Sequence, residues 1–175
     1  DVCSSDLCGV TDNKFKEWDD DPAPLHGELG EDYDVARAKW GDPWRIPTYG
    51  DIQSLVKACG NSSKLIDAPE SITQGGVYWV TAGDIIDGTT YRVAGALFVT
   101  TDDLAKRLFF PGAGNLQGVS RDGVETLCTY WSSIRDSQYP DHALVLSIST
   151  VEHTVNIIHS LVKRCFGLSI RPVAY

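Results

Sequence analysis

The chain has 175 residues, 42% of them hydrophobic, so we expect one globular domain with a substantial core. Its formal charge is −9. Residues 12 to 34 hold nine carboxylates against two lysines, whereas residues 35 to 175 have a net charge of zero. An acidic arm on a neutral body argues against a nucleic-acid partner, because affinity for a phosphate backbone depends on clustered lysine and arginine. No apolar run reaches the roughly 18 to 20 residues of a membrane span, so we expect none.

Two segments precede the expected domain. Residues 1 to 7 read DVCSSDL, which is the translation of a common sequencing-adaptor string, so we expect an artefact there and a natural protein that is truncated upstream. Residues 8 to 31 form the acidic arm, which we interpret as a solvated stretch because the spaced aspartates of a calcium loop are missing. The domain itself is expected over residues 32 to 175.

Two helices are predicted at the start of the domain. The stretch EDYDVARAKWG, residues 31 to 41, has helical apolar spacing and ends at a glycine. The second helix begins with Thr48 as its N-cap, and Asp51 three residues later completes a capping-box-like pair. Its predicted buried face consists of Ile52, Leu55, Val56 and Cys59.

Between these helices lies the stretch WGDPWRIPT, residues 40 to 48, which we call the elbow. Two prolines restrict the backbone, so the helices cannot merge into one. The elbow is expected to be structural, with Trp40 and Trp44 buried between the helices and Arg45 paired with a carboxylate or a helix carbonyl.

From residue 75 onward, β-branched and aromatic residues alternate with glycine-rich turns, which predicts many short strands in a mostly antiparallel sheet. Residues 101 to 108, TDDLAKRL, fit either a single helical turn or an extension of a hairpin. Within CTYWSS we expect Tyr130 and Trp131 to belong to the core. The predicted fold class is therefore α+β, with two N-terminal helices packed on a twisted, mostly antiparallel sheet.

Catalytic and metal sites have weak support in the sequence. Four cysteines outside the adaptor-like stretch are widely spaced and suggest buried free thiols, with a disulfide in an oxidising compartment as the alternative. No C-x-x-C pair, clustered histidine ligands or G-x-S-x-G nucleophile motif is present. We therefore expect no cofactor, no metal and no enzymatic activity.

Five sequence segments follow one another along the chain: DVARAKWGDPWRIPTYGDIQSLVKAC, YRVAG, LFFPGAG, YWSS and GLSIRPV. Over residues 32 to 173 this set resembles the Fibrobacter succinogenes major paralogous domain and related Lcl-type domains of the C-type-lectin-fold superfamily. The resemblance implies two helices on a twisted antiparallel core, with the last strand returning close to the first. It also implies a secreted or lipid-anchored protein of the bacterial cell surface, with ligand contacts in the loops of the C-terminal half.

The sequence departs from parts of that superfamily. The calcium-dependent sugar-binding signatures of animal C-type lectins are missing, so any binding is expected to be independent of calcium. Formylglycine-generating enzymes share the superfamily and use two nearby cysteines, for which Cys128 and Cys165 are the candidates. A related oxidoreductase is therefore kept as a less favoured alternative.

The interpretation we favour is a ligand-binding or adhesion module for carbohydrate or protein on a cell surface, and the alternative is a structural spacer domain of a larger surface protein. Loops that combine arginine, amide, aromatic and imidazole groups on a rigid scaffold are typical of recognition surfaces. The candidate ligand-binding residues follow YWSS and LFFPGAG, and they are Arg135, Asp136, Gln138, Tyr139, His142, Asn115, Gln117 and Arg121.

Overall fold

The structure, a computed structural model, describes residues 2–3, 34–136, 142–163 and 166–174. These residues contain two helices, α2 (Val35–Trp40) and α3 (Tyr49–Ala58), and are otherwise rich in strands. The strands are β1 (Val2–Cys3), β2 (Trp44–Arg45), β3 (Ile66–Asp67), β4 (Gly76–Val80), β5 (Ile85–Ile86), β6 (Thr89–Thr90), β7 (Gly95–Val99), β8 (Arg107–Pro111), β9 (Asn115–Gln117), β10 (Ser120–Asp122), β11 (Leu127–Arg135), β12 (His142–Ser149), β13 (Thr154–Lys163), β14 (Ser169–Ile170) and β15 (Val173–Ala174). The prediction of a mixed α+β chain dominated by strands is confirmed.

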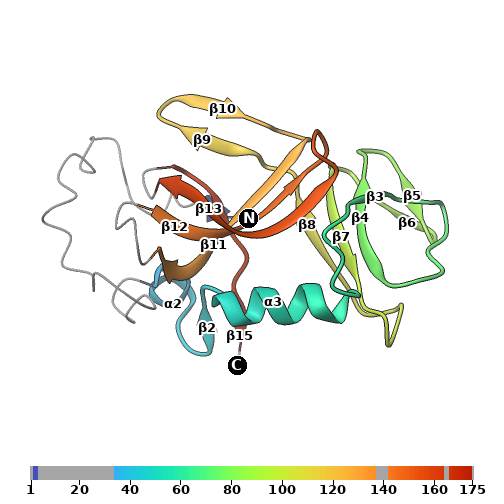
Figure 1. The fold of residues 1–175 in the computed structure, drawn as a ribbon, viewed down its shortest axis with the longest axis horizontal. Helices are drawn as coiled ribbons and strands as arrows, with labels where there is room; N and C mark the ends of the chain where they lie inside the picture. Colours follow the sequence, from blue (N-terminus) through green and yellow to red (C-terminus); the bar gives the residue numbers. More distant parts are fainter. Residues whose placement is uncertain (1, 4–33, 137–141, 164–165, 175) are drawn as a thin grey trace, which may run out of the picture.

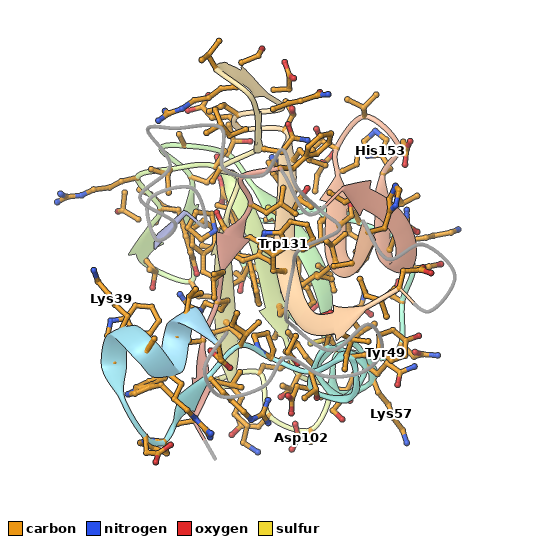
Figure 2. All side chains as sticks on the ribbon, turned by 90° about the vertical axis from the view of Figure 1, so that its left-hand side faces the viewer. Lys39, Tyr49, Lys57, Asp102, Trp131 and His153 are labelled. Carbon is orange, nitrogen blue, oxygen red and sulfur yellow. The ribbon has the colours of Figure 1, made fainter. Side chains whose placement is uncertain are left out.

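Two larger sheets form the body of the molecule (Figure 1). One has the strand order β3-β4-β7-β8, and the other has the order β1-β14-β11-β12-β13. Within them, β3 with β4 and β11 with β14 are parallel pairs, and the other pairs are antiparallel. Helix α3 contacts both β7 and β11, so it covers the junction of the two sheets, and Lys57 points from its outer side into solvent (Figure 2).

The strands β4 and β7 show how the sequence forms the core. All five residues of each strand are buried, and successive side chains point to opposite faces of the sheet. On one face, Val77 and Phe98 join the main core with α3, β11 and β12. On the other face, Tyr78 and Leu97 pack in a separate cluster under the β5–β6 hairpin. Burial on both faces explains why these strands read as continuous apolar runs.

The two helices that flank the elbow both begin with side-chain capping. Asp34 has extended backbone and accepts hydrogen bonds from the backbone N–H groups of Ala36 (2.9 Å) and Arg37 (3.1 Å), so α2 begins at Val35. Thr48 and Asp51 form the predicted capping box at the start of α3. Between them, the Asp42–Pro43 peptide bond is cis.

The C-terminal residues return to the elbow. Strand β15 pairs with β2 in antiparallel register, with Val173 opposite Arg45 and Ala174 opposite Trp44. Just before it, β14 pairs with β11 through Tyr130 and Ser169. Residues 171–174 are thereby placed beside the elbow, more than 120 residues away in the sequence.

The prediction of two N-terminal helices packed on one twisted antiparallel sheet is wrong. Helix α2 has only six residues, because Asp34 serves as its N-cap, and the described strands form two larger sheets and three two-stranded ones instead of a single sheet. Residues 101 to 108 form the β7–β8 connection and the start of β8, not a helical turn. The part of the chain that the structure describes contains no helix long and apolar enough to cross a membrane.

Candidate functional site

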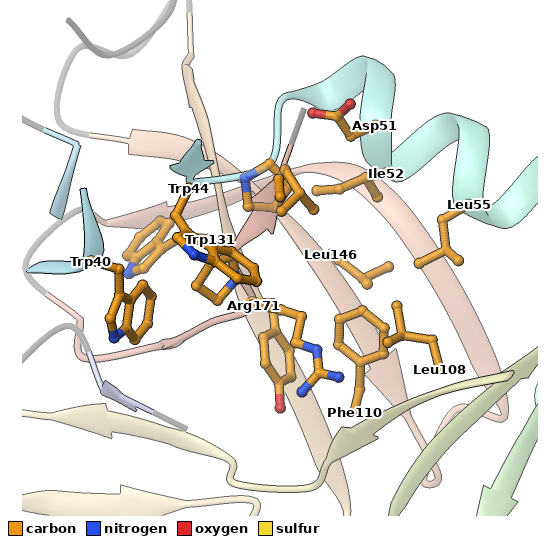
Figure 3. A pocket seen from close by; sticks show the side chains of 15 residues that line it. Trp40, Trp44, Asp51, Ile52, Leu55, Leu108, Phe110, Trp131, Leu146 and Arg171 are labelled. Atoms are coloured by element: carbon orange, nitrogen blue, oxygen red, sulfur yellow. The ribbon is translucent and has the colours of Figure 1, made fainter. Parts of the chain in front are cut away.

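A cavity of about 820 Å³ opens between the elbow, α3 and the C-terminal residues (Figure 3). Its lining comes from five separate parts of the chain: residues 40–47 of the elbow, α3, β8, the β11–β12 pair and residues 171–174. We call this cavity the elbow cleft. Its volume lies within the range of pockets that hold small ligands.

Aromatic rings dominate the lining of the elbow cleft. Phe110, Tyr130 and Trp131 are buried, with exposed fractions of 4%, 1% and 8%. Trp40 and Trp44, by contrast, are exposed at 43% and 41%, and their rings form a T-shaped contact with an interplanar angle of 64° and centroids 6.5 Å apart. Figure 3 shows the two indoles side by side at one end of the cleft, next to Trp131. The cleft therefore has buried aromatic rings within it and two accessible indoles beside them.

The exposed indoles correct the prediction for the elbow. We expected Trp40 and Trp44 to fill the space between the two helices, but the buried residues of the elbow are Ile46, with an exposed fraction of 3%, and Pro47. The backbone N–H of Ile46 donates to Asp34 Oδ2 (2.9 Å), which turns the isoleucine inward. Ile46 packs with Ala36, Leu168 and neighbouring residues in a small cluster. The space that we assigned to the indoles is therefore occupied by a smaller side chain.

One acidic group borders the elbow cleft, and its charge is already neutralised. Asp51 forms an ion pair with Arg45, with Nη1–Oδ2 and Nη2–Oδ1 distances of 2.5 and 3.2 Å, and it also accepts from the backbone and side chain of Thr48. Hydrogen bonding from Arg45 is the main reason why the pKa of Asp51 falls from 3.8 to about 2. The prediction that Arg45 pairs with a carboxylate is confirmed.

The other charged group in the cleft is Arg171, which is partly exposed. Its guanidinium carbon lies 5.9 Å from the ring centroid of Phe110, and Figure 3 shows the guanidinium reaching toward that ring. Among the described residues, no carboxylate lies within 4.0 Å of the Arg171 side-chain nitrogens. Nearby, Tyr130 donates its hydroxyl proton to the carbonyl oxygen of Pro111 (2.9 Å). Arg171 therefore supplies a positive charge that no described acidic side chain offsets.

The first group of predicted binding residues lies at the β11–β12 hairpin. Arg135 ends β11, where its backbone pairs with Ala143. Asp136 is buried, with an exposed fraction of 8%, and its backbone N–H donates to the carbonyl oxygen of His142 (3.1 Å). His142 is partly buried. Gln138 and Tyr139 lie outside the described residues.

The second predicted group lies on the β9–β10 hairpin. Asn115 is partly buried, whereas Gln117 and Arg121 are exposed. This hairpin is attached near the other end of β11, because Gly114 bridges Cys128. Seven residues of extended strand separate Cys128 from Arg135, a distance of about 20 Å. The structure thus places the two groups at opposite ends of β11 instead of around one shallow site.

Neither predicted group lines the elbow cleft, although some of the residues that do line it stand out in the sequence. Tryptophan and proline are dense in the elbow, a pattern that by itself predicts core packing. Tyr130 and Trp131 are confirmed as buried residues, and both also contribute to the cleft. Arg171 stands in GLSIRPV, between β14 and β15, and its place in the sequence alone says nothing of the elbow more than 120 residues earlier.

The described residues offer little that suggests catalysis. No group of three His, Cys, Asp or Glu side chains among them is arranged to hold a metal ion. Cys59 and Cys128 are buried free thiols, as predicted for these two, and burial raises their pKa values to about 11 and 12. Cys8 and Cys165 lie outside the described residues, so the possible pairing of Cys128 with Cys165 stays a prediction.

No protein-family model, curated protein sequence or solved structure matches this chain. The resemblance to the Fibrobacter succinogenes major paralogous domain therefore stays a prediction.

Proposed function

We propose that this chain is a non-enzymatic ligand-binding module and that the elbow cleft is its binding site. The observation that carries the proposal is the pair of exposed indoles, Trp40 and Trp44, beside a cavity of about 820 Å³. If a tryptophan has about 250 Å² of surface, each of these residues leaves roughly 100 Å² in contact with water. At about 25 cal/mol per Å², covering each one with an apolar ligand surface contributes up to about 2.5 kcal/mol.

The chemistry of the described thiols supports a binding role over catalysis. A cysteine nucleophile must ionise, but burial holds the Cys128 pKa at about 12. Its Sγ also lies 3.3 Å from the carbonyl oxygen of Phe110, to which the thiol donates. A formylglycine-type reaction at Cys128 therefore has no support in its surroundings.

The wider setting follows from the resemblance and belongs to the same proposal. The resemblance implies a C-type-lectin-like fold in a secreted or lipid-anchored surface protein. It also implies that this protein adheres to carbohydrate or protein, and the missing calcium-binding signatures indicate that it does so without calcium. The loop residues Arg135 and Tyr139 stay candidates for contacts outside the cleft. The principal ligand contacts are thus proposed to lie in the elbow cleft, and not in the loops that the sequence suggested.

The test is a glycan, peptide and small-molecule array probed with the purified domain, followed by titration of each hit. Trp44→Ala is expected to weaken binding at least about tenfold, which corresponds to about 1.4 kcal/mol. Val151→Ala removes an exposed apolar side chain at the β12–β13 turn and is the matched control, with unchanged binding expected. Arg135→Ala tests the competing loop site.

Two results would overturn the cleft as the principal site. One is saturable binding that Arg135→Ala abolishes while Trp44→Ala leaves it unchanged, which would place the ligand at the β11–β12 hairpin. The other is the absence of saturable binding to any array component, which would favour the structural spacer. Melting curves of every variant accompany the titrations, so that lost binding is separated from lost folding.

A further inference from the structure

The elbow cleft contains few groups that can hydrogen-bond a polar ligand. Apart from Arg171, Asp51 and the N–H groups of three indoles, its side chains are apolar, and the one hydroxyl, that of Tyr130, already donates to Pro111. A sugar in such a cavity would lose water from several hydroxyl groups and would meet only one carboxylate among the lining side chains, at a cost of about 1 to 3 kcal/mol for each group left unsatisfied. The interior of the cleft therefore favours an apolar body over a carbohydrate.

The charges in the cleft favour a negative group on that body. Arg45 neutralises Asp51 through two hydrogen bonds, so this carboxylate repels an anion only weakly. Arg171 has no such partner among the described residues. A guanidinium presents a planar set of N–H donors that matches the two oxygens of a carboxylate. Because residues 35 to 175 have no net charge, the surrounding body does not counteract this attraction.

We infer that the elbow cleft binds a monocarboxylate with an apolar, preferably aromatic, body. The carboxylate pairs with the guanidinium of Arg171, and the body packs against the indoles of Trp40 and Trp44. This inference rests on the proposed function, because it names the ligand class of the same site. The same chemistry is found in a free aromatic acid and in the C-terminal residue of a peptide that ends in phenylalanine.

The experiment uses matched probes that differ only in charge. Quenching of tryptophan fluorescence is measured with 4-phenylbutyrate and with the neutral 4-phenylbutanamide. A second pair consists of Gly-Gly-Phe and its C-terminal amide. If the tripeptide binds more tightly than 4-phenylbutyrate, the preferred ligand is the C-terminus of a peptide and not a free aromatic acid. The whole chain is titrated, and each acid is expected to bind at least about tenfold more tightly than its amide.

Three variants connect this preference to the arginine. Arg171→Gln removes the charge and is expected to abolish the difference between acid and amide. Arg171→Lys keeps the charge but loses the planar donors, so an intermediate preference is expected. Arg92→Gln removes an exposed arginine that does not line the cleft, and it should leave both affinities unchanged.

The inference on ligand class and the proposed site can fail separately. If acid and amide bind equally, and Trp44→Ala weakens both, the cleft is a binding site but the carboxylate assignment is wrong. The assignment is also wrong if Arg171→Gln keeps the full preference for the acid in a folded protein, or if no carboxylate probe binds saturably up to millimolar concentrations. If an acid binds with an Arg171-dependent preference and Trp44→Ala does not weaken its binding, the arginine assignment stands and the role of the indole is refuted.

Discussion

Asp34 is expected to determine whether the elbow stays in place. Its carboxylate is 6% exposed and accepts three backbone hydrogen bonds, two from the first turn of α2 and one from Ile46. Loss of an N-cap costs about 0.5 to 2 kcal/mol, and a buried N–H left without an acceptor costs about 1 to 3 kcal/mol. We therefore expect Asp34→Ala to lower the free energy of unfolding by about 2 to 4 kcal/mol. For a chain of this size, that corresponds to a fall in Tm of roughly 5 to 15 °C.

Urea unfolding followed by circular dichroism measures this change. Asp34→Asn is the matched control, because its amide oxygen can still cap α2 while its NH₂ group faces the N–H of Ile46. An intermediate loss of about 1 to 3 kcal/mol is expected for it. A loss below about 0.5 kcal/mol for Asp34→Ala would refute the reasoning, because it would mean that water replaces all three hydrogen bonds.

Four further outcomes are expected. Trp44→Ala should cost only about 1 to 2 kcal/mol in a melting experiment, since its ring is 41% exposed, and a loss of 3 to 5 kcal/mol would indicate the buried ring that the sequence suggested. The lowered pKa of Asp51 stabilises the fold above pH 4, and this contribution disappears as the pH falls through about 2. The upper limit of this contribution is about 2.4 kcal/mol, and solvent screening reduces it to about 1 kcal/mol. The free energy of unfolding of Asp51→Asn should therefore be lower than that of the unchanged chain by about 1 kcal/mol at pH 6, and the two values should converge near pH 2. Iodoacetamide at pH 8 should label Cys59 and Cys128 at least about tenfold faster in urea than in the folded state, as peptide mass spectrometry can show. EDTA should leave Tm unchanged, and a fall would reveal a bound ion.

Local signals in the sequence predicted local structure well. The Thr48–Asp51 capping box, the end of α2 at Gly41 and the buried face of α3 depend on residues within a few positions of each other. The strand-rich second half was predictable for the same reason, since runs of β-branched residues between glycines indicate strands from the local sequence alone. The division into two sheets was not predictable in this way, because strand pairing is decided by contacts between distant segments.

The elbow cleft was missed because its walls meet only in the folded chain. The pairing of β15 with β2 places Arg171 and Val173 beside Trp44, and neither sequence segment indicates the other. The burial of Trp44 was predicted from its size and apolar character alone. The hydrogen bond from the backbone N–H of Ile46 to Asp34 joins two distant positions, and in this arrangement Ile46 is buried while Trp44 is exposed.

The way the elbow that carries the two indoles is held supports binding more strongly than the exposure of the indoles does. The main core contains no residue of the elbow, so the central packing of the domain does not depend on Trp40 or Trp44. Three separate features nevertheless fix the elbow: the Asp34 hydrogen bonds, the Arg45–Asp51 ion pair with its capping box, and the β2–β15 pairing. A backbone segment that is held in place before a ligand arrives loses less conformational freedom on binding than one that must be ordered by the ligand. Solvent-facing spacer surface has no need of such ordering, whereas a binding site gains affinity from it.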